Sequence, residues 1–418
     1  MIFSKAKNIY REFPVNFWTL MSAMFIDRLG GALLFPFFAL YITQKFDVGM
    51  TEVGYLFAIF SVANFVGNMI AGALTDKFGR RWMLMFGLVI SAMSSLLMAF
   101  VDSLPLFYVL AGFVGLLSEA GGPAQQAMVA DLLPQEKHAE GYGMMRVIAN
   151  LAVTIGPAVG GLLAAKSYLF LFVADAVSSI ITAVVVYFAL PETKPEIAEA
   201  EEQNFSQTMA GYKHVFRDGV YMAFLLISIL GIIVYIQMYS TLSVYLDEVF
   251  GTGARGYGYL LSMNAAMVVL FQFWITRRIS NRPPLLMLAL GTAIFGVGFL
   301  MYGFISAFWL FMVAMAIITV GEMIITPVGQ AFVARLAPVD MRGRYMAMFG
   351  FSWAVPHAVG PLLAGLIMDN ADPRWVWYAA GITAAVAVMG YVGLHFAVRN
   401  RLQPVPGDGA ASLPASPE

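Results

Sequence analysis

Charged side chains that interrupt long apolar stretches are the residues of this sequence best placed to do chemistry. They are Asp27, Arg28, Glu119, Arg146, Asp175 and Glu322. A charge at the centre of a membrane costs about 2.5–3.5 kcal/mol or more, so such residues face a wet interior and bind or move ions, protons or substrates. The chemistry that they indicate is binding and proton exchange.

Three of the acids are candidates for carrying a coupled proton: Glu322, Asp27 and Glu119. No Lys or Arg lies within the apolar stretches around Glu322, and a carboxylate buried without a cation is expected to bind a proton near neutral pH. Asp27 is the equivalent candidate nearer the N-terminus, although the adjacent arginine favours its ionised form. Glu119 could instead pair with Arg146, and Asp175 is expected to be structural.

Polar residues at helical spacing extend these sites into stripes. Residues four positions apart share one helix face, and this spacing relates Arg146 to Asn150 and Glu322 to Thr326. The candidates for the lining of a substrate cavity are Arg28, Asn64, Asn68, Gln126, Arg146, Asn150, Gln237, Asn264, Thr326, Gln330 and His357. His357 either titrates near physiological pH or is passively hydrogen-bonded. The four acids outnumber the two arginines, which favours cationic or zwitterionic substrates.

Enzyme chemistry is not indicated by the sequence. It contains no phosphate-cradling P-loop and no nucleophile elbow. His138, His214, His357 and His395 lack metal-ligand spacing, and there is no cysteine. We therefore expect a protein that is not an enzyme, with no catalytic residue, no cofactor and no bound metal.

Membrane-spanning helices must position these residues. Of the 418 residues, 60% are hydrophobic and 12% are charged, against roughly 45–50% and about 25% in soluble domains. Apolar stretches of about 20 residues can cross a bilayer, and in lipid they must be helical because every backbone polar group needs an internal partner. The expected spans are 15–43, 53–75, 82–101, 105–131, 139–165, 168–190, 220–247, 256–276, 285–304, 307–335, 342–368 and 374–398.

The distribution of Lys and Arg predicts the orientation of the chain. If the N-terminus is inside, the inner segments hold 18 of the 24 basic residues and the outer segments hold four. This asymmetry fits the positive-inside rule. Both termini are therefore expected in the cytoplasm, and residues 1–17 are expected to be a leader into the first span, not a cleaved signal peptide.

The sequence also repeats itself. One constant shift relates Gly54 to Gly258, Pro123 to Pro327, Pro134 to Pro338 and Gly156 to Gly360, without a gap. We therefore predict two repeated halves, residues 1–190 and 220–400. A polar cytoplasmic linker, 191–219, joins them, and a disordered cytoplasmic tail, 401–418, follows. In such an architecture the binding site is expected between the halves, near the middle of the membrane.

The most specific motif lies between the second and third expected spans. Residues 72–81, GALTDKFGRR, resemble the signature of the major facilitator superfamily. The resemblance implies a cytoplasmic latch between the halves, with an acid at the inner end of the fourth span. Its residues are Gly72, Asp76, Gly79, Arg80, Arg81 and Asp131. The corresponding loop of the second half, 276–284, lacks the acid and the glycines, so the latch is expected on one side only. A basic loop with a turn would explain the arginines but not the acid and both glycines.

A second motif lies on the fifth expected span. It resembles the antiporter motif of drug:proton exchangers, with Ala152 where that pattern prefers glycine. Its residues are Gly143, Gly156, Pro157, Gly160 and Gly161. Small residues let membrane helices pack closely, and a proline kinks its helix. Ordinary helix packing would also account for these residues, so the motif favours export without settling the direction.

The resemblance is closest to bacterial drug:proton antiporters, which are twelve-span multidrug facilitators. It implies an all-α membrane protein with the major facilitator fold, twelve transmembrane helices in two pseudo-symmetric six-helix halves, in the cell (inner or plasma) membrane. The expected function is secondary active transport, with proton-coupled export of small amphipathic or cationic compounds by alternating access. Export of a metabolite, a sugar or a lipid, and a non-transporting sensor on the same scaffold, are the alternatives. The expected partners are a small-molecule substrate, protons and membrane lipids, without nucleic acid, and the chain is expected to be a monomer.

Overall fold

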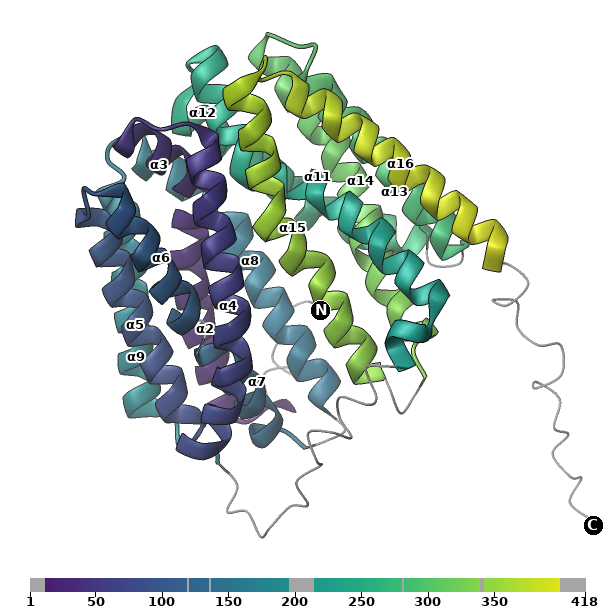
Figure 1. Ribbon diagram of the computed structural model, residues 1–418. Coiled ribbons are helices and arrows are strands. Elements are labelled where there is room, and N and C mark those ends of the chain that lie inside the picture. Colours follow the sequence, from purple (N-terminus) through teal and green to yellow (C-terminus); the bar gives the residue numbers. More distant parts are fainter. Residues whose placement is uncertain are drawn as a thin grey trace, which may run out of the picture.

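The protein is helical throughout the part of the chain that the computed structural model describes. The described residues are 12–118, 120–134, 137–194, 214–279, 282–338 and 342–398. Glu119, most of the expected linker and the whole expected tail lie outside these ranges. Twelve segments of the described chain are long and apolar enough to cross a membrane (Figure 1). The chain is therefore a multi-pass membrane protein, as its composition predicts.

Each half contributes six of these segments. In the first half they are α2 (Val15–Leu34) with η1 (Phe35–Phe37) and α3 (Phe38–Phe46), α4 (Met50–Phe78), α5 (Arg80–Phe100), α6 (Leu104–Ser118) with α7 (Gly121–Leu132), α8 (His138–Ala164) and α9 (Leu169–Ala189). In the second half they are α11 (Gly219–Phe250), α12 (Gly253–Ile279), α13 (Pro284–Tyr302), α14 (Phe308–Leu336), α15 (Arg342–Asn370) and α16 (Trp375–Val398).

One span that the sequence predicted as a continuous helix is interrupted. The first span contains the 3-10 turn η1, with Pro36 in its first turn. Proline has no N–H to donate to the preceding helical turn, so it favours such a break. The fourth span is described in two parts, α6 up to Ser118 and α7 from Gly121. Glu119, which lies between these parts, is outside the described residues.

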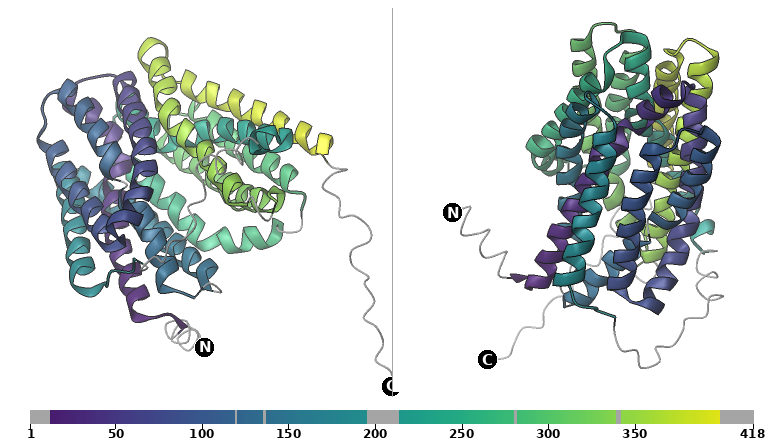
Figure 2. Two further views of the ribbon diagram at one scale, coloured as in Figure 1. Left: turned by 60° about the horizontal axis from the view of Figure 1, so that its bottom comes forward. Right: turned by 90° about the vertical axis from the view of Figure 1, so that its left-hand side faces the viewer.

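The two sets of six spans form two bundles that lean together at one end. Figure 1 shows the helices of the first half, mostly in purple and blue, beside those of the second half, which run from teal through green to yellow. We call the end with the α4–α5 loop and the approach to the linker the linker face. The opposite end, with the α3–α4 and α11–α12 loops, is the far face. Figure 2 shows the bundles from two further sides.

Buried side chains show where the halves hold together. One large apolar cluster draws residues from both halves, among them Phe37, Leu56, Tyr257 and Trp377, and it lies towards the far face. Two smaller clusters lie towards the linker face, and each belongs to a single half. Close van der Waals packing is a main source of cohesion between membrane helices. The halves therefore share a core at the far face and have separate cores at the linker face.

Glycines allow the closest approaches within the shared core. A Cβ on Gly54 of α4 would lie 2.4 Å from the Cα of Leu362 on α15, and a Cβ on Gly365 would lie 2.5 Å from the carbonyl carbon of Met50. A Cβ on Gly161 of α8 would lie 3.0 Å from the Cα of a glycine on α12. Small residues at such positions let membrane helices pack backbone to backbone.

Candidate functional site

A cavity of about 1690 Å³ lies between the two halves. Helices α2, α5, α7, α8 and α9 form most of one wall, and α11, α12, α14 and α15 form the other. The lining runs from Phe57, next to the shared core, to Thr276, near the linker-face end of α12. A mostly apolar cavity with a few convergent polar groups is the usual form of a small-molecule site.

Glu322, at the middle of α14, lies among hydrogen-bond donors on the second-half wall. The hydroxyl of Tyr235 donates to its Oε1 at 2.9 Å, and Nδ2 of Asn264 donates to its Oε2 at 2.8 Å. The same amide donates to Oγ1 of Thr319 at 2.9 Å. Among the described residues, no Lys or Arg forms an ion pair with Glu322. The cavity therefore contains a carboxylate that is hydrogen-bonded but not neutralised by a described cation.

Aromatic rings surround this carboxylate. Tyr235 and Tyr239 lie one turn apart on α11, with their hydroxyl oxygens 3.3 Å apart. The ring of Trp353 on α15 meets that of Tyr235 edge-on, with centroids 5.8 Å apart. Nδ1 of His357 lies 2.9 Å from the carbonyl oxygen of Trp353, which assigns the proton to that nitrogen. Ring faces beside a carboxylate suit a cationic group.

The acids of the first-half wall are held by serine hydroxyls. Ser95 donates a short hydrogen bond to Oδ2 of Asp175, and Ser179 donates to Oδ1 of Asp27 at 3.2 Å. The hydroxyl of Ser179 also lies 3.4 Å from that of Ser91. Because these contacts join α2, α5 and α9, both carboxylates take part in the packing of the first half as well as in the cavity lining.

Two arginines of the first half face the cavity. Arg28 lies on α2, and Arg146 lies on α8, where its guanidinium donates a short hydrogen bond to Oε1 of Gln330 on α14. Neither arginine forms an ion pair with a carboxylate of the described residues. The pairing of Arg146 with Glu119 considered from the sequence involves a residue outside the described ranges.

Most of the expected lining residues reach the cavity, but four do not. Those that line it are Arg28, Arg146, Asn150, Asn264, Thr326, Gln330 and His357, together with the coupling candidates Asp27 and Glu322. Those that the structure places elsewhere are Asn64, Asn68, Gln126 and Gln237.

Local packing explains each of the four corrections. Helix α4 reaches the cavity only near the far face, and Asn64 and Asn68 lie further along, where α4 packs against α6. The side chain of Gln126 is exposed, and its neighbour Gln125 is buried and lines the cavity instead. Gln237 is buried within the second half, where its Nε2 donates to the carbonyl of Gly360 at 3.0 Å.

Sequence reasoning missed several lining residues, namely Tyr235, Tyr239, Trp353, Gln125, Ser91 and Ser95. The tyrosines had a usable signal, since they lie four positions apart on one face of an otherwise apolar span. Trp353, Ser91 and Ser95 gave no such signal, because a tryptophan or a serine in an apolar span is also common at packed or lipid-facing positions.

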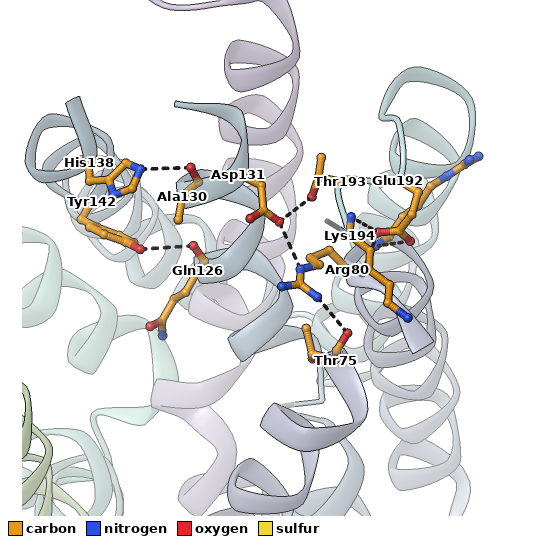
Figure 3. A network of polar contacts seen from close by, with 11 residues as sticks. Thr75, Arg80, Gln126, Ala130, Asp131, His138, Tyr142, Glu192, Thr193 and Lys194 are labelled. Carbon is orange, nitrogen blue, oxygen red and sulfur yellow. Dashed lines mark hydrogen bonds and ion pairs between the residues drawn. The ribbon is translucent and has the colours of Figure 1, made fainter. Parts of the chain in front are cut away.

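The predicted latch residues form a network at the linker face (Figure 3). Nε of Arg80 donates to Oδ2 of Asp131 at 3.1 Å, and the hydroxyl of Thr193 donates to the same oxygen at 3.0 Å. The carboxylate of Glu192 accepts the backbone N–H groups of Arg80 and Arg81 at 2.8 and 3.2 Å, at the N-terminus of α5. A carboxylate at a helix N-terminus is favoured by the helix dipole.

The backbone at Gly79 explains why this network needs a glycine. Gly79 has φ 99° and ψ 159°, a conformation that is essentially confined to glycine. A Cβ there would lie 2.5 Å from Oε2 of Glu192. The contacts drawn in Figure 3 join residues of the first half and of the approach to the linker. A latch to the second half stays a prediction, and the surroundings of Gly72 and the side chain of Asp76 lie outside what the structure describes.

The second half has a different network at the linker face. Asp218 accepts the backbone N–H of Tyr221 at 3.1 Å and so caps α11. Its other oxygen accepts the hydroxyl of Tyr345 at 2.9 Å. Burial and this neighbouring carboxylate raise the pKa of Tyr345 to about 12, so the phenol keeps its proton and remains a donor.

The residues that resemble the antiporter motif divide between two roles on α8. A Cβ on Gly156 or Gly160 would clash with α2, at 2.5 Å from the Cβ of Ala32 and at 2.4 Å from the carbonyl oxygen of Leu33. Pro157 lines the cavity. A Cβ on Gly143 would meet no atom within 4 Å, and this glycine also borders the cavity. Gly143 therefore borders the cavity and makes no close helix contact.

Polar contacts close the far face between the halves. Both oxygens of Asp369, near the C-terminus of α15, accept backbone N–H groups at the start of α4, from Met50 at 2.9 Å and from Thr51 at 2.7 Å. Nε2 of Gln44 donates to Oδ2 of Asp247 at 2.7 Å. Asp369 thus satisfies the N-terminus of a helix in the other half, a charge-assisted contact that a neutral side chain would make more weakly.

Comparisons with known proteins agree with this architecture. The chain is 27% identical over 379 residues to a Na(+), Li(+), K(+)/H(+) antiporter of Planococcus maritimus, covering 84% of this chain and 87% of that protein. It is 22% identical over 374 residues to multidrug resistance protein 1 of Bacillus subtilis, covering 88% and 93%. A crystal structure of the nucleoside transporter NupG superposes with a TM-score of 0.74 at 13% identity, covering 91% of this chain and 99% of that one.

The family assignment follows from the sequence as well as from the fold. Two overlapping stretches of the chain, residues 20–356 and 285–416, match the sequence profile of the Major Facilitator Superfamily. Together they extend over both six-helix halves and include every cavity residue described above. This chain of twelve candidate spans, with its cavity between two halves, belongs to the Major Facilitator Superfamily, and it is a secondary transporter.

Proposed function

We propose that the protein is a proton-coupled antiporter that exports small amphipathic or cationic compounds. The observation that carries the proposal is the position of Glu322 on the cavity wall. Its carboxylate accepts hydrogen bonds from two neutral donors, and no Lys or Arg of the described residues forms an ion pair with it. In antiport, a proton and a substrate use the same conformational cycle in turn. A carboxylate that faces the substrate cavity can bind the proton when the substrate is absent and release it when the substrate arrives.

Alternating access is supported by the contrast between the two faces. The shared core and the Asp369 contacts close the far face, whereas the linker-face cores are separate. Opening the far face would break the hydrogen bonds of Asp369 to α4, and the predicted latch of Asp76 would form at the other end. Each face would then be closed by contacts that exist in only one of the two states.

The direction and the location belong to the same proposal. The excess of Lys and Arg on the linker face supports a cytoplasmic linker and cytoplasmic termini in the cell membrane. The partners are then a small molecule, protons and membrane lipids, and the chain acts as a monomer. The relative in Bacillus subtilis is named multidrug resistance protein 1, which supports drug-like small molecules as substrates.

A second candidate, exchange of an inorganic monovalent cation for protons, is favoured by one observation. The relative in Planococcus maritimus is named as an antiporter of Na(+), Li(+) and K(+). The two candidates share the proton site and differ in what replaces the proton.

The test is pH-driven flux through the full chain reconstituted in vesicles. Substrates are a lipophilic cationic dye and, separately, Na+ and Li+. We expect the wild type to accumulate the dye when a pH gradient is imposed. Glu322→Gln should still bind the dye and equilibrate it, but should not accumulate it, because the glutamine cannot carry a proton. Glu140→Gln, an exposed residue at the start of α8, is the matched control and should behave as the wild type.

Three results discriminate between the possibilities. Full pH-driven accumulation by Glu322→Gln would contradict the assignment of the coupled proton to Glu322. Asp27 and Glu119 would then be the candidates for carrying this proton. Accumulation of Na+ or Li+ without the dye would favour the second candidate. A flux that does not change with the pH gradient, in the wild type and in every variant, would contradict proton coupling.

A further inference from the structure

We propose that Arg28 and Arg146 form an anion subsite, so that the transported compound is an amphipathic zwitterion with a carboxylate or a similar acidic group. The inference rests on the proposed function in one respect, since it takes the cavity between the halves as the substrate site. It goes further by assigning the two ends of the substrate to opposite walls of that cavity.

The packing of α2 against α8 places the two arginines on one wall. Gly156 packs against Ala32, and Gly160 packs against Leu33, so the two helices run side by side in parallel from the linker face. Arg28 lies one turn before Ala32 and therefore faces the same neighbour. Arg146 and Asn150 lie one turn apart on α8, and all three polar residues line the cavity. Arg28, Arg146 and Asn150 thus line the cavity from two adjacent helices, and Arg146 reaches Gln330 on the facing wall.

These arginines make no contact ion pair with the carboxylates of Asp27 and Asp175, which line the same wall. Neither forms an ion pair with a carboxylate, and the partner of Arg146 is the neutral amide of Gln330 from the other half. The nearby acids have other partners, because Asp27 accepts from Ser179 and Asp175 accepts from Ser95. A cation inside the membrane is costly unless an anion or a wet cavity compensates it. A substrate anion would supply that compensation.

The opposite wall is suited to the other end of the same molecule. There Glu322 accepts a hydrogen bond from Tyr235, whose ring packs against Tyr239 and Trp353, and such an aromatic set next to a carboxylate suits a cationic or amine group. A guanidinium presents a planar fork that fits a carboxylate or a phosphate. A molecule with an amine at one end, an acid at the other and an apolar body between them would meet all three features of the cavity.

A matched pair of dyes tests the inference at equilibrium, without a pH gradient. One is a rhodamine with a free carboxylate, and the other is the methyl ester of the same rhodamine, which is cationic. Binding is measured by fluorescence anisotropy on the full chain in nanodiscs. We expect the wild type to bind the acid about tenfold more tightly than the ester, since a hydrogen bond to a charged group is stronger than one to a neutral group.

Variants of the arginines identify the subsite. Arg28→Gln and Arg146→Gln should each lose most of the preference for the acid while they keep the affinity for the ester, which shows that they are folded. Arg146→Lys should restore part of the preference. Arg255→Gln, an exposed residue at the start of α12, should keep all of it.

Several outcomes would overturn the inference. They are equal binding of the two dyes by the wild type, tighter binding of the ester, binding of neither dye, or a preference for the acid that survives both glutamine substitutions. None of these results depends on proton coupling. A wild type that prefers the acid but shows no pH-driven flux would support the anion subsite and contradict the proposed function. A wild type that shows pH-driven flux but no preference for the acid would support the proposed function and contradict the anion subsite.

Discussion

The two walls of the cavity come from repeated halves of one chain but present different chemistry. On the first-half wall, Asp27 and Asp175 are held by serine hydroxyls while Arg28 faces the space between the halves. On the second-half wall, Glu322 lies among tyrosine and asparagine donors, with no described cation paired to it. The repeat therefore preserves the positions of the helices and not the charges that they carry.

This difference separates two tasks that both require charge in the membrane. A carboxylate tied to packing serine residues is part of the structure of its half, whereas a carboxylate that faces the cavity among neutral donors can exchange its proton with a substrate. We assign structure and anion binding to the first wall, and proton exchange and cation binding to the second. Substitutions on each wall can break this division or sharpen it.

The largest expected effect is the contrast between two acids that line the cavity, Glu322 and Asp27. Glu322→Gln should abolish pH-driven accumulation of the dye in vesicles, whereas Asp27→Asn should retain it, with a rate reduced by less than about tenfold, equivalent to roughly 1.4 kcal/mol. The reason is that the carboxylate of Asp27 accepts a hydrogen bond from Ser179 of α9 and so helps to hold α2 against α9. Loss of accumulation in both variants would mean that the two walls share the proton and would break the division.

A smaller effect is expected from a donor to the central carboxylate. Tyr235→Phe removes the hydroxyl that donates to Glu322 at 2.9 Å and leaves the ring in place. One such hydrogen bond contributes about 1.5–3 kcal/mol when the acceptor is charged. We expect pH-driven flux at about a tenth of the wild-type rate, with coupling retained. Tyr239→Phe is the matched control, because its hydroxyl contacts Tyr235 and not the carboxylate, and it should lose less. An equal loss of pH-driven flux in Tyr235→Phe and Tyr239→Phe would show that the hydrogen bond to Glu322 is not what makes Tyr235 important.

The smallest effect is expected at Asp175, the acid for which we expect a structural role. Ser95→Ala removes the hydroxyl that donates to the buried carboxylate of Asp175. Leaving a buried acceptor without a partner costs about 1–3 kcal/mol, so the melting temperature in detergent should fall by a few degrees. Coupled flux should stay close to that of the wild type. Ser94→Ala on the same helix, whose hydroxyl bonds only within α5 in the described contacts, should change the melting temperature less. Lost coupling in Ser95→Ala would give Asp175 a role in transport.

The sequence predicted the architecture well for a physical reason. Membrane spans are recognisable because lipid demands long apolar helices, and the expected spans, the fold and the family were all confirmed. The break at Pro36 was missed, because hydropathy does not record whether an apolar segment is one helix or two.

The lining of the cavity was less predictable. In a helix that is apolar on all sides, periodicity does not tell which face meets lipid, a neighbour or the cavity. The sequence therefore selected Gln126 where the structure places Gln125 at the cavity, and it selected Gln237, which bonds within its own half. The role of Glu192 as the carboxylate at the N-terminus of α5 was also missed, since that contact joins residues far apart in the sequence.

The most direct test of the central claim is the release of protons when substrate binds. The purified protein in weakly buffered detergent is mixed with a lipophilic cationic dye, the rhodamine methyl ester. A pH indicator reports the number of protons released per protein. We expect the wild type and Asp27→Asn to release protons on binding, whereas Glu322→Gln should bind the dye and release none. Proton release by Glu322→Gln equal to that of the wild type would contradict the assignment of the coupled proton to Glu322.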